Sequence, residues 1–327
     1  MNPFQYQRAQ DAAGAIRSVS PRSKFLAGGT NLIDLMKNGV EKPDTLIDLN
    51  RVALAAIELR PDGGLRLGAL ARNSDTANHP MVRQRYPLLS HAILSGASPQ
   101  LRNLATNGGN LLQRPRCPYF MDPGFAQCNK RAPGSGCGAL EGFNRVHAIL
   151  GASEHCIAVQ PSDMSVALAA LEATIRVQGR SGERVIRMAD FHRLPGDTPH
   201  IDTNLKPDEL IVSIDLPASP YAANCHYLKV RDRASYEFAL VSVAAAFELD
   251  GGVIRSARIA LGGVAPKPWR AEAAENLLAG QKPSASLFET AGAVAIAGAK
   301  PYRGNGFKVE MAQRAVARAL ANAGGAA

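Results

Sequence analysis

The sequence predicts an α+β protein with two domains. In the first 220 residues, segments that favour strands alternate with short helices, and their apolar residues recur with the period that each element requires. From about residue 222 the pattern changes to long antiparallel strands followed by Ala-rich helices. The segment "LPASPYAAN" between them has linker composition, so we place the boundary near Pro217–Ala222, with domains at 1–220 and 221–327.

The elements of the first domain are predicted in chain order. A short helix at 11–19 precedes a strand at Lys24–Ala27, a Gly-Gly turn and a helix that Gly39 terminates as its C′ residue. Ser74 is expected to cap a later helix, and Asp163 is expected to cap the helix of "QPSDMSVALAAL". The remaining predicted strands lie at 44–49, 63–70, 155–159, 173–177, 182–192 and 209–217, and a further helix at 88–98. The segment at 100–113 ends in a second glycine pair. In the second domain, long strands are expected at 225–249 and 253–271, then helices to the end.

Composition narrows the class of protein. A hydrophobic content of 46% and a charged content of 20% are ordinary for a soluble globular chain of 327 residues. No apolar run is long enough for a membrane span, and the first twenty residues contain no apolar segment of a secretory signal. The net charge is +9, but the basic residues are scattered, so we expect no nucleic-acid partner and favour a basic face that docks an acidic subunit.

Two glycine pairs stand out in the first domain. Gly28-Gly29 follows a predicted strand and precedes a helix, where backbone amides and the helix N-terminus can hold an anion. Gly108-Gly109 in "ATNGGNLL" repeats the arrangement. Either pair alone is more often a tight connection, and neither matches a dinucleotide fingerprint or a phosphate loop. Together with Asp163, whose carboxylate could face a ribose hydroxyl, they form a more specific pattern.

Four segments, "KFLAGGTNLIDLMK", "QLRNLATNGGNLLQ", "QPSDMSVALAAL" and "ELIVSIDLP", resemble the FAD-binding medium subunit of molybdenum hydroxylases. The C-terminal "RIALGGVAPKPWRAEAAENLL" resembles the small C-terminal domain of the same family, so the resemblance covers nearly the whole chain. It implies an FAD-binding domain of the vanillyl-alcohol-oxidase type, in two α/β subdomains at about 1–55 and 56–220. The second domain, 221–327, would be the C-terminal β-sheet and helix domain of the carbon monoxide dehydrogenase flavoprotein.

The resemblance also implies which residues hold FAD. The pyrophosphate would lie on the "AGGTN" turn, and an apolar side chain at Ile211 would face a flavin or adenine ring. No His or Cys lies in either glycine turn, so we expect noncovalent binding, which a β-branched residue at Gly28 would impair by crowding the pyrophosphate. The implied contacts are Phe25, Leu26, Ala27, Gly28, Gly29, Thr30, Asn31, Leu32, Ile33, Thr106, Gly109, Asn110, Asp163, Ile211 and Lys229.

The segment at 114–156 carries four of the five cysteines, Cys117, Cys128, Cys137 and Cys156. Four thiolates can hold a [4Fe–4S] cluster or a zinc ion, and the spacing, which contains no C-x2-C, leaves these two near even. Disulfides are a third reading, which the lack of a secretory signal disfavours. Cys225 falls outside the group and reads as an ordinary buried cysteine.

The resemblance favours iron and sulfur over zinc. Some members of the family carry an additional [4Fe–4S] cluster in an insertion at this place, and "RCPYF", "CNKR", "PGSGC" and "HCIA" are most similar to the version in a periplasmic aldehyde oxidase. We therefore expect a cluster on the four cysteines, with a structural or side-path role. His147 and His155, which flank the insertion's end, read as polar loop residues rather than ligands.

No catalytic pattern of side chains is recognisable, which fits a subunit whose bound cofactor performs the chemistry. The resemblance implies a large subunit with the molybdenum cofactor, a small subunit with two [2Fe–2S] clusters, and an external acceptor, either dioxygen or an electron carrier. It also suggests a periplasmic complex exported through a signal on a partner, with a cytoplasmic complex as the alternative. Two other classes stay open: a self-contained flavoprotein oxidase and a zinc-stabilised interaction module.

Overall fold

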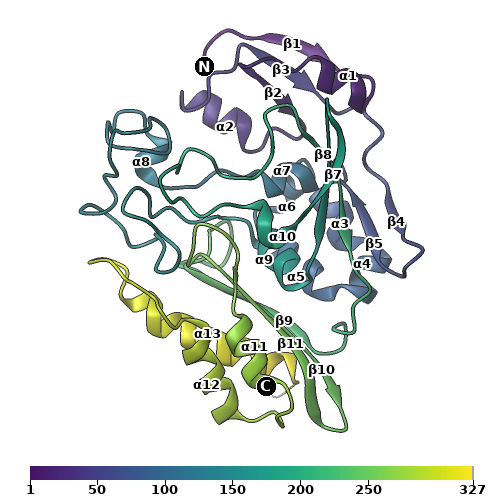
Figure 1. Ribbon diagram of the computed structural model, residues 1–327, viewed down its shortest axis with the longest axis vertical. Helices are drawn as coiled ribbons and strands as arrows, with labels where there is room; N and C mark the ends of the chain where they lie inside the picture. Colours follow the sequence, from purple (N-terminus) through teal and green to yellow (C-terminus); the bar gives the residue numbers. More distant parts are fainter. Residues whose placement is uncertain (326–327) are drawn as a thin grey trace.

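The computed structural model describes residues 1–325 and contains three sheets, stacked along the long axis of the molecule (Figure 1). The first sheet has strand order β1-β3-β2 and is entirely parallel. Two short helices connect its strands. The elements are β1 (Gln5–Arg8), α1 (Ala12–Arg17), β2 (Ser23–Leu26), α2 (Leu32–Lys37) and β3 (Thr45–Asp48).

Local sequence explains where both helices begin and end. The Asp11 carboxylate accepts a hydrogen bond from the Gly14 amide at 2.6 Å and so caps α1. Gly39 follows the C-cap of α2 with φ +71°, which confirms the predicted stop signal. Strand β1 was not predicted, because "QYQR" is exposed along its whole length and shows no apolar alternation.

The second sheet is antiparallel, with strand order β4-β5-β8-β6-β7. Helices α3 to α7 lie together beside it, and α9 packs against α5 in the main hydrophobic core. The strands are β4 (Ile57–Leu59), β5 (Leu65–Gly68), β6 (Thr174–Gly179), β7 (Gly182–Arg187) and β8 (Leu210–Leu216). The helices are α3 (Asn73–Asn78), α4 (Pro80–Arg85), α5 (Pro87–Ser95), α6 (Pro99–Arg102), α7 (Asn107–Leu111), α9 (Asp163–Ala170) and α10 (Met188–Phe191).

The third sheet is antiparallel, with order β12-β11-β10-β9, and helices α11 to α13 pack on it (Figure 1). Phe247 and Phe288 join strand and helix in this second core, with ring centroids 6.2 Å apart. The elements are β9 (Cys225–Val230), β10 (Val241–Asp250), β11 (Val253–Gly262), β12 (Trp269–Arg270), α11 (Glu272–Leu278), α12 (Ala285–Ala295) and α13 (Phe307–Ala323). The α+β class is thereby confirmed.

Three local predictions are wrong. Residues 155–159 form no strand, because beyond one isolated bridge between Ser153 and Cys156 this segment has no strand partner. Helix α3 begins at Asn73 rather than after Ser74, since the Asn73 amide is already bound to the Ala105 carbonyl at 2.8 Å. The second glycine pair lies inside the first turn of α7, not in a turn before it, because Thr106 caps that helix.

Residues 114–156, called the cysteine insertion below, project to one side of the molecule (Figure 1). Helix α8 (Pro118–Met121) is the one regular element that this range contains, and the rest is turns and loops. None of the helices within residues 1–325 combines the length and apolar character that a bilayer crossing requires.

Candidate functional site

The first glycine pair forms the turn between β2 and α2, where two chain segments approach closely. A Cβ on Gly28 would lie 2.0 Å from the Leu104 carbonyl oxygen, and Gly29 has φ +70°. Glycine is therefore required at both positions by the fold itself. The expected crowding at Gly28 comes from the backbone of Leu104, before any ligand is considered.

The second glycine pair lines the same cavity as the first. The Thr106 hydroxyl accepts a hydrogen bond from the Gly109 amide at 3.3 Å, which orders the first turn of α7. A Cβ on Gly109 would meet only that hydroxyl, at 3.1 Å, so a bound group can approach the backbone here.

Two cavities of about 430 and 140 Å³ adjoin at Thr30, Asn31 and Gly109, and together they are called the glycine cleft below. Fourteen of the fifteen residues expected to contact FAD line one or both cavities. The fifteenth, Ile33, is the second residue of α2 and is absent from both linings. The structure thus brings together segments that are up to about two hundred residues apart in the sequence.

The cleft also contains an unsatisfied polar group that suits a cofactor. The Asn31 side-chain oxygen accepts from the Arg114 amide at 3.1 Å, whereas its Nδ2 is buried without a hydrogen-bond partner. Buried donors are rarely left unpaired. Because Asn31 lies where the two cavities meet, a phosphate or carbonyl oxygen of FAD there would satisfy it. The residues present therefore fit FAD.

Asp163 and Lys229 form a buried ion pair at the larger cavity. The Lys229 ammonium lies 2.7 Å from the Asp163 carboxylate, and the two side chains are 4% and 8% exposed. The Tyr227 hydroxyl donates to the same carboxylate at 2.7 Å, and burial beside it raises the pKa of Tyr227 well above its usual value. Lys229 is thus a buried partner of Asp163.

The structure corrects the role predicted for Asp163. The N-cap of α9 is Ser162, whose hydroxyl accepts from the Ser165 amide at 2.9 Å. Asp163 is the first helical residue, which frees both carboxylate oxygens for Tyr227 and Lys229.

A buried amide network behind the cleft was missed by sequence reasoning. The Asn110 side chain donates to Asn73 at 2.6 Å and accepts from the Ser162 hydroxyl at 2.5 Å. Asn107, which is fully buried, donates to Thr76 at 2.9 Å and so joins α7 to α3. The asparagines that flank the glycine pair in "NGGN" were a signal, because buried amides need partners.

The four cysteines of the insertion lie near one another as free thiols. Cys128 and Cys137 face each other in an antiparallel bridge, while Cys128 and Cys156 are buried. Burial raises the pKa of Cys117 to about 12, with smaller contributions from Cys156 and Cys128. Burial also raises the pKa of Cys156, which Cys137 and Cys128 raise further. These mutual effects indicate that the four sulfurs share one neighbourhood.

The four thiols are soft donors of the kind that iron–sulfur clusters and zinc ions both accept. Within residues 1–325, no three His, Cys, Asp or Glu side chains are close enough to hold one metal ion together. Each cysteine of a [4Fe–4S] cluster binds a different iron, so its ligands lie farther apart than those of one zinc ion. Four free thiols in one neighbourhood, two of them buried, match the ligand type of such a cluster.

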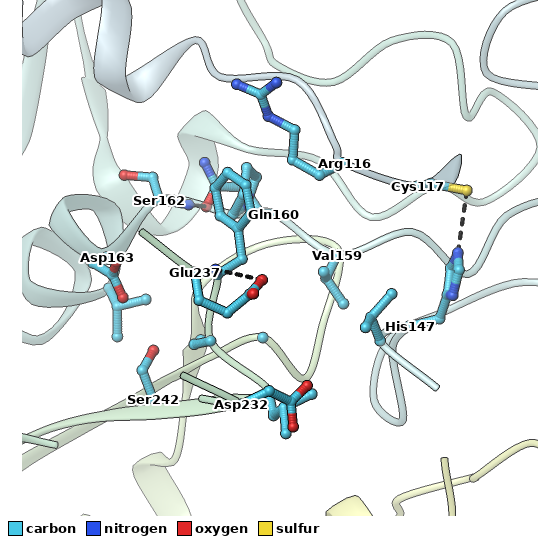
Figure 2. Close-up of a pocket in the computed structure, with 18 residues that line it drawn as sticks. Arg116, Cys117, His147, Val159, Gln160, Ser162, Asp163, Asp232, Glu237 and Ser242 are labelled. Carbon is cyan, nitrogen blue, oxygen red and sulfur yellow. Dashed lines mark hydrogen bonds between the residues drawn. The ribbon is translucent and has the colours of Figure 1, made fainter. Parts of the chain in front are cut away.

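A third cavity, of about 140 Å³, lies between the cysteines and the glycine cleft. Figure 2 shows Asp163 and Ser162 at one side of it and the Cys117–His147 pair at the other. Arg116 lines both this cavity and the larger cavity of the cleft. The two candidate cofactor regions are thus neighbours, joined through the backbone at Arg116 and Cys117.

The fold and the cleft define a class of protein. Residues 2–219 match the family model "FAD binding domain in molybdopterin dehydrogenase", and residues 226–323 match "CO dehydrogenase flavoprotein C-terminal domain". The chain belongs to the family of FAD-binding subunits of molybdenum hydroxylases, whose members are oxidoreductase subunits.

Individual relatives support this assignment along the whole chain. The chain is 52% identical to the aldehyde oxidoreductase FAD-binding subunit PaoB of Escherichia coli, over 99% of both chains. It is 31% identical to the glyceraldehyde dehydrogenase medium chain of Sulfolobus acidocaldarius, over 85% of this chain and 82% of that one. Among solved structures, carbon monoxide dehydrogenase from Hydrogenophaga pseudoflava matches with a TM-score of 0.77 and 27% identity, covering 99% of this chain and 98% of that chain.

Proposed function

We propose that this chain is the FAD-carrying electron-transfer subunit of a heterotrimeric, molybdenum-dependent aldehyde oxidoreductase. The observation that carries the proposal is the 52% identity to an aldehyde oxidoreductase FAD-binding subunit over nearly the full length. A large subunit with the molybdenum cofactor would oxidise the aldehyde, and a small subunit with [2Fe–2S] clusters would pass the electrons to this chain. Bound FAD would collect these electrons and deliver them to an external acceptor.

The chain's own contribution to this transfer is binding and electrostatics. The amides of the Gly28-Gly29 turn and of the first turn of α7 would hold the phosphates. Ile211, which lines the smaller cavity, would pack on a ring of the cofactor. The buried pair of Asp163 and Lys229 would present fixed charges to the cofactor's polar edge or its ribose. These residue assignments are part of the proposal.

We include in the proposal an additional [4Fe–4S] cluster held by Cys117, Cys128, Cys137 and Cys156. Its support is the shared neighbourhood of the four thiols and the small local cluster beside them, in which Phe120 and Cys128 pack against Leu35 of α2. Ligation would supply folding free energy that such a loop lacks. The location proposed for the complex is the periplasm, reached by export together with a signal-bearing partner.

One preparation tests these statements together. The complex purified through this chain should contain one large and one small partner, FAD that acid releases into solution, and iron with acid-labile sulfide beyond the amount that two [2Fe–2S] clusters account for. It should oxidise aldehydes with dioxygen or an electron carrier as acceptor, and fractionate with the periplasm. A catalytically complete single chain would contradict the proposal and favour a self-contained flavoprotein oxidase.

A second candidate is a molybdenum hydroxylase with another substrate. It is favoured by relatives such as the carbon monoxide dehydrogenase medium chain of Hydrogenophaga pseudoflava, 26% identical over 97% of this chain. Because the substrate would bind to the large subunit, comparing the rates of aldehyde, purine and carbon monoxide oxidation by the purified complex separates the candidates.

A further inference from the structure

The cysteine insertion contains one histidine whose ring touches a cysteine sulfur. His147 Nε2 lies 3.1 Å from Cys117 Sγ, and the two residues come from opposite ends of the insertion (Figure 2). His147 is 1% exposed, so this contact is shielded from solvent competition. Its other ring nitrogen, Nδ1, has no hydrogen-bond partner among the described residues.

The backbone of His147 is held by the C-terminal domain. Its carbonyl accepts from the Lys308 ammonium at 2.9 Å and from the Asn305 amide at 3.3 Å, and both side chains are fully buried at the start of α13. Lys308 donates to the Gly263 carbonyl as well, which ties the same point to the end of β11. On the other side, the His147 amide donates to the Asn144 carbonyl at 3.0 Å. The ring is therefore positioned by fixed neighbours rather than by a loop alone.

The chemistry of a bound Cys117 decides which group donates. A cysteine that binds iron is a thiolate, which can only accept a hydrogen bond. The proton between the two residues must then be on His147 Nε2, which makes Nδ1 the unprotonated nitrogen. The ring thus presents one N–H directly to one sulfur of the four-cysteine group.

We propose that His147 raises the reduction potential of the cluster by donating its Nε2–H to Cys117 Sγ, with Lys308 as the positioning residue that keeps the ring in place. Adding one electron to a cluster increases the negative charge on its sulfurs, so a fixed donor stabilises the reduced form more than the oxidised form. This inference rests on the proposed [4Fe–4S] cluster and assigns no ligand role to His147.

The test compares variants of the purified holo-complex by redox titration, following the cluster by electron paramagnetic resonance. His147→Phe keeps a ring but removes the donor. We expect the equilibrium constant for reduction of the cluster to fall about tenfold, which lowers its one-electron potential by about 59 mV. His147→Gln places an N–H the same number of bonds from the backbone, so its potential should stay near that of the wild type. Lys308→Met keeps the imidazole but frees its backbone, and should give a smaller shift in the same direction.

His226→Leu is the matched control. This partly buried histidine contacts Asn322, fourteen residues along α13 from Lys308, or about 21 Å at 1.5 Å per residue, so its loss should leave the potential unchanged. Unchanged potentials in both His147→Phe and Lys308→Met, with iron present, would overturn this inference and leave the proposed cluster standing. Equal shifts in His147→Phe and His147→Gln would do so too, because the donor would then be irrelevant.

Iron content separates this inference from the proposal on which it depends. A wild-type complex without the additional iron and labile sulfide would refute the cluster itself, and the role of His147 with it. If His147→Phe does not load iron, Lys308→Met decides: a lowered potential supports the inference and a wild-type potential contradicts it.

Discussion

The glycine cleft and the cysteine insertion are neighbours, but different interactions hold them in place. The cleft is bounded by β2, α2, α7 and α9, and its polar groups are paired in caps and a buried amide network. The insertion has one four-residue helix in forty-three residues. Its own buried cluster is small, with Phe120 and Cys128 against Leu35, while Ile149 and Leu150 near its end join the core of the C-terminal domain.

The contrast indicates that the fold preforms the cleft, whereas the proposed cluster would add stability that the insertion lacks. Hydrophobic burial stabilises the sheets and helices around the cleft at roughly 25 cal/mol per Å². Around the cysteines, the insertion is held largely by side-chain contacts to carbonyls, such as the bonds of Arg131 to Tyr119 at 2.6 Å and to Phe120 at 3.1 Å. Such bonds contribute only about 1 kcal/mol each, which does not offset the cost of ordering a long loop.

The largest expected effect comes from removing one cysteine of the insertion. Cys128→Ser should abolish the additional iron and labile sulfide and sharply reduce soluble complex, because the buried thiol is lost together with its proposed ligand bond. FAD per assembled chain should stay near the wild-type value. Cys225→Ser, outside the insertion, is the control. Normal assembly of Cys128→Ser with slowed electron transfer would instead make the cluster an electron relay.

A single methyl group tests how rigid the cleft is. Gly28→Ala puts a Cβ at 2.0 Å from the Leu104 carbonyl oxygen, so the Gly28-Gly29 turn and the backbone at Leu104 must separate. We expect FAD content to fall on the order of tenfold, as for other severe backbone clashes, while iron stays constant. Gly306→Ala, where a Cβ meets nothing within 4 Å, should bind FAD normally. Full FAD content in Gly28→Ala would show that the cleft adapts.

Removing one partner of the buried ion pair in the cleft should destabilise the fold more than removing both. Lys229→Met leaves the Asp163 carboxylate buried without its cation, which should lower the free energy of unfolding by about 3–5 kcal/mol. The double variant with Asp163→Asn should recover part of that loss. Denaturant unfolding of the four chains of this cycle measures the coupling, and purely additive losses would mean that the pair contributes no specific stabilisation.

The smallest expected effect is the pH dependence of the stability that buried His192 contributes. Burial lowers the pKa of His192 to about 4, and its ring Nε2 lies 2.8 Å from the Leu111 carbonyl of α7. In the unfolded chain His192 therefore binds a proton below about pH 6.5, whereas in the folded chain it binds one only below about pH 4. Stability from this residue is complete above pH 6.5 and falls by up to about 3 kcal/mol at pH 4.

His192→Leu should flatten this part of the pH–stability curve, although the unpaired Leu111 carbonyl will lower stability at every pH. The exposed His200 provides the control, since His200→Leu should leave the slope as it is. The measurement is the unfolding midpoint between pH 7 and pH 4. An unchanged slope in His192→Leu would show that other groups dominate acid unfolding.

Much of the fold was predictable because its signals are local. The apolar periods of α2 and β8, the Gly39 stop signal and the change of pattern near residue 222 all depend on neighbours in the sequence. Predictions failed where a distant partner decided the outcome. Strand β1 is polar and exists because β3 pairs with it, and α3 begins where Ala105 supplies an acceptor.

For the candidate site, the sequence by itself determined the ingredients: two glycine pairs, four clustered cysteines and the family to which they belong. Those features are chemical identities and spacings, which need no coordinates to recognise. Only the tertiary structure decided that Leu104 packs on Gly28, that Lys229 pairs with Asp163, and that His147 meets Cys117. Each of these contacts joins residues between thirty and seventy-six positions apart, so it follows from how sheets and loops pack rather than from any local preference.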